Sequence, residues 1–347
     1  MRRACLLALL SLLTSFCFPV AYADRGMIPV TPDVSVYEPG QKAIVAWNGQ
    51  EEILILSTDV SASSETVVLE ILPLPSRPVV EAASFQTFQT IQDMIWTEGV
   101  NLKAFSTYLD ARSGSVEVLF HEQIGAHNIT VVEASIASAL VDWANSFLLA
   151  SGVDHEITLQ NFESVVEDYM SRGFRHYVLD IITFSPAERS VDPILYRFDS
   201  STLYYPLLIT SPVGGDGEIT LFTLTEGKLT RDYQPFSLAF YQAFGGQLQP
   251  IQFVLSRGDL SKIDLRIGEL FPEGAWLNVL RYEGNLRYLS GDLMISDPAF
   301  QPPVDSSQIV VVELPFNIVA VSFLLGALAV LLGIVIGALI IRLSSKK

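Results

Sequence analysis

An uncharged apolar stretch near the C-terminus constrains this chain more than any other feature. Residues 318–341 (IVAVSFLLGALAVLLGIVIGALII) contain no charge and no proline, and their only polar side chain is that of Ser322. A helix rises about 1.5 Å per residue, so this stretch makes a helix of about 36 Å, which crosses a hydrocarbon core of about 30 Å with some tilt. The sequence therefore predicts a C-terminal transmembrane helix over residues 317–341.

The N-terminus has the pattern of a secretory signal peptide over residues 1–23. Two arginines follow Met1, residues 4–18 form an apolar run, and the small-x-small sequence AYA at residues 21–23 is a cleavage site. The pattern predicts cleavage between Ala23 and Asp24. The alternative, an uncleaved membrane helix, is disfavoured because the apolar run is too short to span a bilayer comfortably.

A cleaved signal peptide fixes the sidedness of the chain. The mature N-terminus lies outside, the chain crosses the plasma membrane once, and the tail at 342–347 is cytoplasmic. The basic residues of that tail, Arg342, Lys346 and Lys347, agree with the positive-inside tendency. Function must then reside in the outer region or in the membrane helix.

Both cysteines, Cys5 and Cys17, lie in the predicted signal peptide. The mature chain would then have no disulfide, no thiol nucleophile and no cysteine-ligated metal. An outer region of about 290 residues is large enough to be stable through its hydrophobic core, as one large domain or as two lobes.

The outer region is strongly acidic. It contains all 38 acidic residues of the chain and 16 of the 21 basic ones, which gives a formal net charge of −22. Such a surface repels phosphate backbones and anionic lipid head groups, so nucleic acid is not expected as a partner. We favour solubility outside the cell as the reason for this charge, with recruitment of cations or basic partners as the alternative.

β-Strands are predicted in the first part of the outer region. Two strand-like runs, 42–47 and 51–57, flank Asn48-Gly49-Gln50, and Asn-Gly supplies the positive φ angles of a tight hairpin. Residues 65–72 predict a third strand that is ended by Pro73, Pro75 and Pro78, because proline cannot donate to a sheet. Further strands are predicted at 115–120 and 129–133.

About three amphipathic helices are predicted next. The first is capped by Ser84 and runs to about Trp96, the second is capped by Ser135, and the third covers 158–172 and stops at Gly173. Each has an apolar stripe at helical spacing. The stripes are Phe85, Phe88, Ile91 and Ile95; Ile136, Leu140, Trp143 and Phe147; and Phe162, Val165, Val166 and Tyr169.

From residue 175 onward the pattern returns to strands, with a hairpin turn at Glu283-Gly284-Asn285. Strands are predicted at 176–184, 194–198, 207–210, 218–225, 250–255, 276–282 and 286–295. Strands, then helices, then strands favour an α+β fold: a strand-rich extracytoplasmic domain over residues 24–296. Residues 297–316 include a proline-rich run without periodicity and predict a short stalk, whose first twelve residues reach at most about 37 Å.

No residue pattern predicts a catalytic, cofactor or metal site. The four histidines match no zinc-binding spacing, and the chain has no nucleophile elbow, phosphate-binding loop or dinucleotide fingerprint. Residues 214–218 (GGDGE) offer oxygen ligands but lack the alternating acids of a calcium loop, so we interpret them as a turn between strands. The histidines are His121, His127, His155 and His176.

Two further features have both a functional and a structural interpretation. Asn128-Ile129-Thr130 is an acceptor sequon for an N-linked glycan or a chance tripeptide. A set of aromatic residues could line a sugar or peptide groove, but strand cores use the same residues, and we favour the core. The set is Tyr196, Tyr204, Tyr205, Phe236, Phe240, Tyr241 and Phe244.

The middle of the chain carries four short motifs. They are an I-G-x-x-x-[IV]-x-V-x-E-A strand at 124–134, an L-V-D-W helix at 140–143, a Y-x-x-R-G-F helix end at 169–174 and a Y-P-L strand at 205–207. In these motifs residues 124–210 resemble the uncharacterised exported prokaryotic family called domain of unknown function 2330. The resemblance implies export and one continuous domain, and it assigns no catalytic residue. The early cysteine cluster of many family members is absent here.

These features predict a single-pass type I membrane protein whose outer domain binds, senses or has a structural role in the envelope, and we favour a non-enzymatic role. One alternative is an envelope hydrolase that uses acidic residues. The other is an accessory subunit of a membrane complex, with a protein partner or a second copy. Gly326, Gly333 and Gly337 lie on one face of the predicted membrane helix, which otherwise contacts the lipid bilayer, and predict a helix-pairing surface.

Overall fold

The computed structural model describes residues 28–29, 36–37, 41–58, 61–62, 66–97, 123–124, 126–153, 160–184, 191–212, 215–242 and 247–296. The chain divides into two compact units, Met1–Pro303 and Val304–Lys347, and every described residue lies in the first. The predicted cleavage site at Ala23 and Asp24, the stalk and the membrane helix with its three glycines lie outside the described residues. Within the described ranges, no helix has the length and apolar character needed to cross a membrane.

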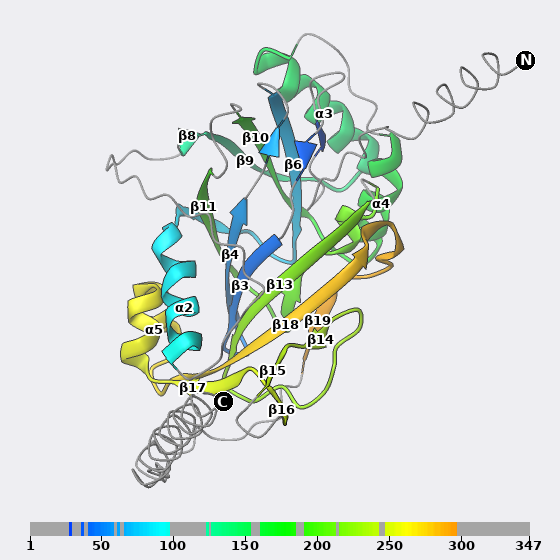
Figure 1. Ribbon diagram of the computed structural model, residues 1–347. Helices are drawn as coiled ribbons and strands as arrows, with labels where there is room; N and C mark the ends of the chain where they lie inside the picture. The colour runs from blue at the N-terminus through cyan, green and yellow to red at the C-terminus, as the bar shows by residue number, and fades with distance from the viewer. Residues whose placement is uncertain are drawn as a thin grey trace, which may run out of the picture. The chain divides into compact units, whose positions relative to one another are not determined.

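The described part of the chain is a strand-rich α+β structure built on two large sheets (Figure 1). The smaller sheet is antiparallel throughout and has the strand order β1-β6-β10-β9-β8. Its strands are β1 (Ile28–Pro29), β6 (Thr66–Leu74), β8 (Gln123–Ile124), β9 (His127–Glu133) and β10 (His176–Phe184). The α+β class predicted from the sequence is confirmed.

The larger sheet has eight strands in the order β14-β18-β13-β3-β4-β11-β7, with β17 also paired to β18. Only β3 and β13 run parallel; the other pairs are antiparallel. The strands are β3 (Gln41–Trp47), β4 (Glu51–Thr58), β7 (Val79–Ala82), β11 (Val191–Asp199), β13 (Asp216–Thr225), β14 (Ser237–Leu238), β17 (Gln252–Leu255) and β18 (Ala275–Asn285).

Three two-stranded sheets and several helices complete the described structure. The small sheets are β2 (Val36–Tyr37) with β5 (Ser61–Ala62), β12 (Leu203–Tyr205) with β19 (Leu293–Ile295), and β15 (Phe240–Gln242) with β16 (Leu248–Pro250). The helices are α2 (Phe85–Thr97), α3 (Ala137–Ala150), α4 (Gln160–Ser171), α5 (Arg257–Ile263) and α6 (Leu265–Leu270), with 3-10 turns η1 (Leu208–Thr210) and η2 (Leu286–Tyr288).

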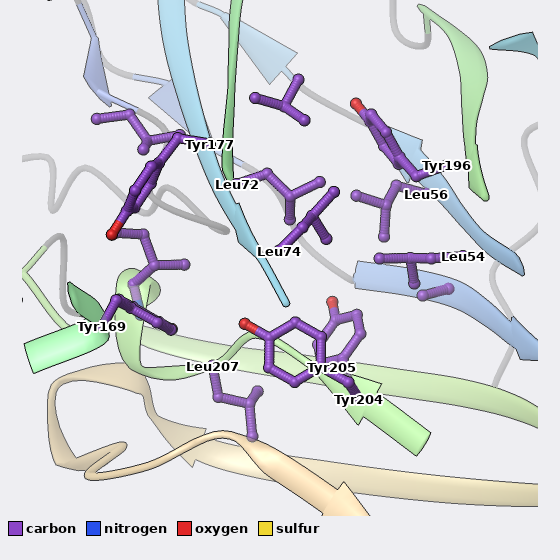
Figure 2. Packing of buried hydrophobic residues seen from close by; sticks show 14 of the residues in the cluster. Leu54, Leu56, Leu72, Leu74, Tyr169, Tyr177, Tyr196, Tyr204, Tyr205 and Leu207 are labelled. Carbon is purple, nitrogen blue, oxygen red and sulfur yellow. The ribbon is translucent and has the colours of Figure 1, made fainter. Parts of the chain in front are cut away.

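Both faces of the larger sheet are buried, which explains why its strands are nearly continuous apolar runs. On one face, Ile44 and Phe222 belong to a cluster completed by α2, α5 and α6. On the other face, Val45 and Leu221 belong to a larger cluster shared with the five-stranded sheet, α3 and α4. Figure 2 shows part of this larger cluster, where tyrosines and leucines from several elements pack together.

The predicted hairpin around Asn48 is confirmed. β3 and β4 pair from Lys42 opposite Ser57 to Trp47 opposite Glu52. Asn48 Oδ1 accepts hydrogen bonds from the backbone N–H groups of Gln50 and Glu51 at 3.0 and 2.9 Å. Gly49 has φ +93°, a left-handed conformation that glycine adopts without a steric cost.

The strand predicted at 65–72 is β6, which continues through Pro73 to Leu74. Pro73 therefore does not end the strand, which stops directly before Pro75, the second of the three prolines predicted to end it. β1 pairs only with Leu69 and Val68, so this side of β6 has no described strand opposite Pro73. A proline is tolerated where its missing N–H faces no neighbouring strand.

Two of the three predicted helices are confirmed with their stripes. In α2, Phe88, Ile91 and Ile95 are buried, and the Oγ of Ser84 accepts a hydrogen bond from the N–H of Gln86 at 3.2 Å. α4 buries Phe162, Val166, Tyr169 and Met170. It ends before Gly173, which has φ +96°.

The predicted buried face of α3 is confirmed for Leu140 and Phe147 and is wrong for Ile136 and Trp143. Its buried residues are Ala137, Leu140, Ala144 and Leu148, whereas Ile136 is 61% exposed and Trp143 is 37% exposed. Ser135 does not cap this helix, because the N-cap position is Ile136, which makes no side-chain cap bond. Two alanines let the helix approach the core closely, and a pattern built on large side chains overlooks them.

Five helices are described, not about three. α5 and α6 occupy seven and six residues, too few for an apolar stripe to repeat. Their caps are local side-chain bonds: Ser256 Oγ accepts from the N–H of Asp259, and Asp264 Oδ1 accepts from the N–H of Arg266.

Most strands predicted after residue 175 are confirmed, with two exceptions. Residues 208–210 form η1 and not a strand. The hairpin predicted at Glu283-Gly284-Asn285 is absent, because β18 continues to Asn285 and η2 follows. Asn285 Oδ1 accepts from the N–H of Arg287, so this asparagine caps a 3-10 turn. Within the turn expected at 214–218, residues 216–218 instead belong to β13.

Candidate functional site

The structure places one of the four histidines in a buried ionic cluster. His127 lies on β9, Asp180 on β10 and Glu70 on β6, and each is at most 3% exposed. Asp180 lies directly opposite Glu70 and also opposite Ile129. Because side chains alternate along a strand, Glu70, Asp180 and His127 share one face of the five-stranded sheet. His176 begins β10, and His121 and His155 lie outside the described residues.

Both ring nitrogens of His127 face oxygen acceptors. Nδ1 contacts Oδ2 of Asp180, and Nε2 lies 3.0 Å from the backbone carbonyl oxygen of Asp192. A neutral imidazole has a single N–H, so only the imidazolium can donate to both acceptors. Burial by itself lowers the pKa of His127, but the hydrogen bond and charge of Asp180, the charge of Glu70 and the Asp192 carbonyl together raise it above 6.5.

The imidazolium offsets a repulsion that the sheet would otherwise contain. Two carboxylates directly opposite each other on neighbouring strands repel, and burial strengthens the effect. His127 places a positive charge beside Asp180 and near Glu70. In this cluster the positive charge of His127 therefore offsets the negative charge of the buried acids inside the five-stranded sheet.

A second polar cluster is centred on Asp292. Its side chain is completely buried, and its Oδ1 accepts hydrogen bonds from the Tyr169 hydroxyl at 2.6 Å and from the N–H groups of Leu207 and Leu208 at 2.8 and 3.0 Å. Its Oδ2 accepts from Nη1 of Arg172 at 2.8 Å. Burial and the charge of Asp292 raise the pKa of Tyr169 well above 10, so its hydroxyl stays protonated and keeps donating.

Two of the four sequence motifs meet at Asp292. The Y-x-x-R-G-F motif supplies Tyr169 and Arg172, and the Y-P-L motif supplies the N–H of Leu207. The guanidinium of Arg172 lies 4.4 Å from the centroid of the Tyr169 ring. Figure 2 shows Tyr169 and Leu207 in the same packed region as Tyr204 and Tyr205. These motif residues join α4, η1 and the segment before β19.

A fourth buried acid lies on the larger sheet. Glu52 of β4 is fully buried, and its Oε2 accepts a hydrogen bond from the N–H of Tyr204 at 2.7 Å. Among the described residues its Oε1 has no hydrogen-bond partner. Burial disfavours the carboxylate and raises the pKa of Glu52 well above 4.5, and the hydrogen bond from the Tyr204 N–H opposes this shift.

These clusters are enclosed by the core. Glu52, Glu70, Asp180 and Asp292 receive hydrogen bonds or ionic contacts from the protein, and none opens to solvent. No set of three or more His, Cys, Asp or Glu side chains suited to a metal ion occurs in the described part of the chain. The arrangement can neutralise charge and join segments, and within the described ranges these clusters offer no exposed nucleophile–base pair.

The sequence reasoning missed all four acids as site residues. Three of them carry a detectable signal. A single carboxylate interrupts an apolar run in LEIL around Glu70 and LDII around Asp180, and in EEILIL two carboxylates, Glu51 and Glu52, stand directly before an apolar run. In a sheet buried on both faces, such an acid has no route to water and must find a partner. Asp292 has no such local signal, because it lies in a loop segment.

The aromatic set divides between the core and the surface. Tyr196, Tyr204, Tyr205 and Phe236 are buried, as the core interpretation predicts. Phe240 is exposed, Tyr241 is half-buried, and Phe244 lies outside the described residues.

The sequon at Asn128 lies in β9, where Asn128 is half-buried and opposite both Gln123 of β8 and Ile181 of β10. Its glycosylation stays a prediction.

Comparisons with known proteins give a family but no characterised relative. No curated protein matches the sequence. Among solved structures, baculovirus P35 covers 76% of this chain and 97% of its own at 9% identity and a TM-score of 0.38. A mutated P35 after caspase cleavage gives a TM-score of 0.36 at 8% identity, over 75% of this chain and 97% of that one. The caspase-8/P35 complex gives a TM-score of 0.34 at 9% identity, over 74% of this chain and 95% of that one. Scores this low do not establish a shared fold.

A family model matches residues 19–254, which are 236 of the 347 residues, and so extends well beyond the segment 124–210 that carries the four motifs. The matched range contains the His127 cluster, Glu52 and both motifs that meet at Asp292, although Asp292 itself lies beyond its end. The chain therefore belongs to the family of uncharacterized proteins conserved in bacteria, DUF2330.

Proposed function

We propose that this protein is held in the plasma membrane by a single C-terminal helix and exposes an α+β domain outside the cell. We propose further that this domain acts as a binding, sensing or envelope-structural module and not as an enzyme. The observation that carries the second part is the burial of the strongest ionisable clusters, those of His127, Glu52 and Asp292.

A catalytic acid or base must come within hydrogen-bonding distance of its substrate. Glu52 has the raised pKa of a general acid, but its side chain is fully buried beneath the backbone of Tyr204. Glu70 and Asp180 are the closest analogue of a carboxylate pair, and they lie inside the sheet beside His127. These acids fit a role in folding better than the envelope-hydrolase alternative.

Membrane anchorage is supported by the sequence. The apolar stretch at 318–341 is long enough to span a bilayer, and the signal-peptide pattern and basic tail give it one orientation. The net charge of −22 in the outer region suits a domain in the aqueous phase.

Anchorage is tested by expressing the full chain with a C-terminal epitope tag in a bacterial host. We expect the protein to stay in the membrane after alkaline carbonate extraction, and protease added to spheroplasts to digest the domain but spare the tag. The matched control ends at Ser296 and is expected in the soluble extracytoplasmic fraction. Release of the full chain by carbonate would contradict the proposal.

The non-enzymatic role is tested with purified protein and fluorogenic peptide, ester and glycan substrates. We expect no turnover that depends on Glu52, Glu70 or Asp180. Turnover that is lost in Glu52→Gln or Asp180→Asn, while the variant keeps its folded circular-dichroism spectrum, would instead support the hydrolase.

The accessory-subunit alternative depends on Gly326, Gly333 and Gly337 and is tested by Gly333→Ile with Gly337→Ile in a membrane two-hybrid assay.

A further inference from the structure

An uncharged segment interrupts the acidic outer region. Residues 233–256 contain no Asp, Glu, Lys, Arg or His over 24 consecutive positions. Asp232 and Arg257 bound the segment on its two sides. A run of this length without charge, in a region with a net charge of −22, marks a surface that does not repel anionic head groups.

The centre of this segment is the β15–β16 hairpin, whose strands pair only with each other among the described strands (Figure 1). Its base is joined to β18: the N–H of Ala239 donates to the carbonyl of Val279, and the N–H of Val279 donates to that of Ile251. The hairpin therefore has a fixed base.

The two faces of the hairpin differ. Tyr241 packs partly against the smaller core cluster. Phe240 and Leu248 occupy the opposite face. Leu248 pairs with Gln242, which lies two residues after Phe240 on the same strand, and residues two apart on a strand, like directly paired residues, share a face. Phe240 is 51% exposed and Leu248 is 70% exposed. A large aromatic and a large aliphatic side chain thus face solvent within an uncharged segment.

The described chain leaves the domain close to this segment. Its last strand, β19, pairs with β12, and the ring of Tyr205 in β12 packs edge-on against Phe236 with centroids 6.5 Å apart. Phe236 belongs to the uncharged segment and is buried. The predicted stalk follows β19 directly, and its 20 residues extend to about 60 Å at ~3.1 Å each. The hairpin is therefore within reach of the bilayer that holds the predicted anchor.

We propose that the β15–β16 hairpin is a lipid-contacting surface that places Phe240 and Leu248 in the interface of the bilayer to which the chain is anchored. This inference rests on the proposed membrane anchorage. The rest of the outer region, with its negative charge, is repelled by anionic lipid, so the uncharged segment is the part that approaches the membrane at least electrostatic cost.

The size of the surface favours lipid over a protein partner. A stable protein interface buries about 800 Å² on each partner, far more than two side chains provide. A tethered domain, in contrast, needs only a weak contact, because its anchor keeps the hairpin at a high effective concentration near the bilayer. Two copies of the domain would also bring like net charges together.

The absence of cysteine from the predicted mature chain makes the test direct. Leu248→Cys creates a unique attachment site for a polarity-sensitive fluorophore, and Ser151→Cys, at the exposed C-cap of α3, is the matched control. Each full-length variant is reconstituted into vesicles of phosphatidylethanolamine and phosphatidylglycerol, and vesicle flotation reports anchorage separately. We expect flotation of both, with a blue shift and quenching by doxyl-labelled lipid only for the label at position 248.

The outcomes separate the two proposals. If the vesicles float but the fluorophore at position 248 shows the emission of an aqueous environment, the hairpin inference is overturned and anchorage still stands. A blue shift without quenching by doxyl lipid identifies a protein contact, such as a second copy, and also overturns it. Failure to float overturns anchorage and the inference together. Phe240→Ser in the Leu248→Cys background checks the result, because the blue shift of the label at position 248 should weaken while flotation is kept.

Discussion

Asp292 accepts hydrogen bonds from segments that are far apart in the chain. Tyr169 and Arg172 come from α4, and the N–H groups of Leu207 and Leu208 come from the turn at η1. At the scale of single residues, this carboxylate holds these segments together. Removing it leaves a buried hydroxyl and two N–H groups without their hydrogen-bond acceptor.

Asp292→Ala is expected to destabilise the protein strongly. Breaking a buried ionic pair costs about 3–5 kcal/mol, and the partial exposure of Arg172 places this case near the lower end. The matched control is Asp168→Ala, which removes the other carboxylate on Arg172, a solvent-exposed partner worth about 0.2–1 kcal/mol. Urea unfolding measures both, and equal losses would contradict the role of Asp292.

The His127 cluster predicts a pH dependence of stability. The pKa of His127 is raised above 6.5 in the folded state, so the folded chain holds this proton more tightly than the unfolded chain. Its stabilising contribution is therefore fully present below about pH 6.5 and is lost as the pH rises through the folded-state pKa.

The test compares the free energy of unfolding of the parent chain and of His127→Gln between about pH 5.5 and 8.5, a window around the ordinary histidine pKa. We expect the difference between them to shrink as the pH rises. Asp180→Asn, which removes the main charge facing His127, should flatten the dependence. A difference that grows with pH would show that His127 is neutral in the fold.

At the scale of elements, α3 shows how close packing selects a helix face. Ala137 and Ala144 are buried, while Trp143 stacks on Phe147 at 5.0 Å and remains partly exposed. Small side chains allow the helix backbone to approach the core, so the buried face combines Ala137 and Ala144 with Leu140 and Leu148, while Ile136 and Trp143 stay largely outside it.

Substitutions along α3 distinguish the two faces. Leu148→Ala should cost about 2–5 kcal/mol, because Leu148 is buried in the larger core cluster and is not part of the predicted stripe. Ile136→Ala, the matched aliphatic change at an exposed position, should stay within about 0.5 kcal/mol. The reverse order in chemical denaturation would restore the face predicted from the sequence.

The end of α4 gives a second prediction for elements. Gly173 has φ +96°, and a Cβ added there would meet no atom within 4 Å, so Gly173→Ala introduces backbone strain without a clash. We expect a loss of about 1–2 kcal/mol. Gly291→Ala, where a Cβ also meets nothing but the backbone is not left-handed, should change the melting temperature little. Similar effects of the two changes would show that strain at Gly173 is unimportant.

At the scale of the whole molecule, the proposed export and anchorage depend on segments at the two ends of the chain. Cleavage after Ala23 is predicted to leave a mature protein that begins at Asp24 and contains no cysteine. Ala21→Leu with Ala23→Leu should block cleavage, because the peptidase requires small residues there. Ala8→Leu, within the apolar run, should leave cleavage intact. Mass spectrometry of the purified chain decides this, and an unchanged mature mass in the double variant would refute the predicted site.

The sequence by itself determined the features whose causes are local. Asn48 and Gly49 made the first hairpin, Ser84 began α2 and Gly173 ended α4, because turn and cap chemistry acts within a few residues. The α+β class followed from the order of these elements.

Only the tertiary structure decided which groups meet. Glu70 and Asp180 are 110 positions apart and become neighbours through strand pairing, and Asp292 meets Tyr169 across 123 positions. The buried face of α3 and the 3-10 turn at Leu208 likewise depend on what packs against them. A buried charge requires a partner, but its own neighbours in sequence do not say which residue the fold will bring to it.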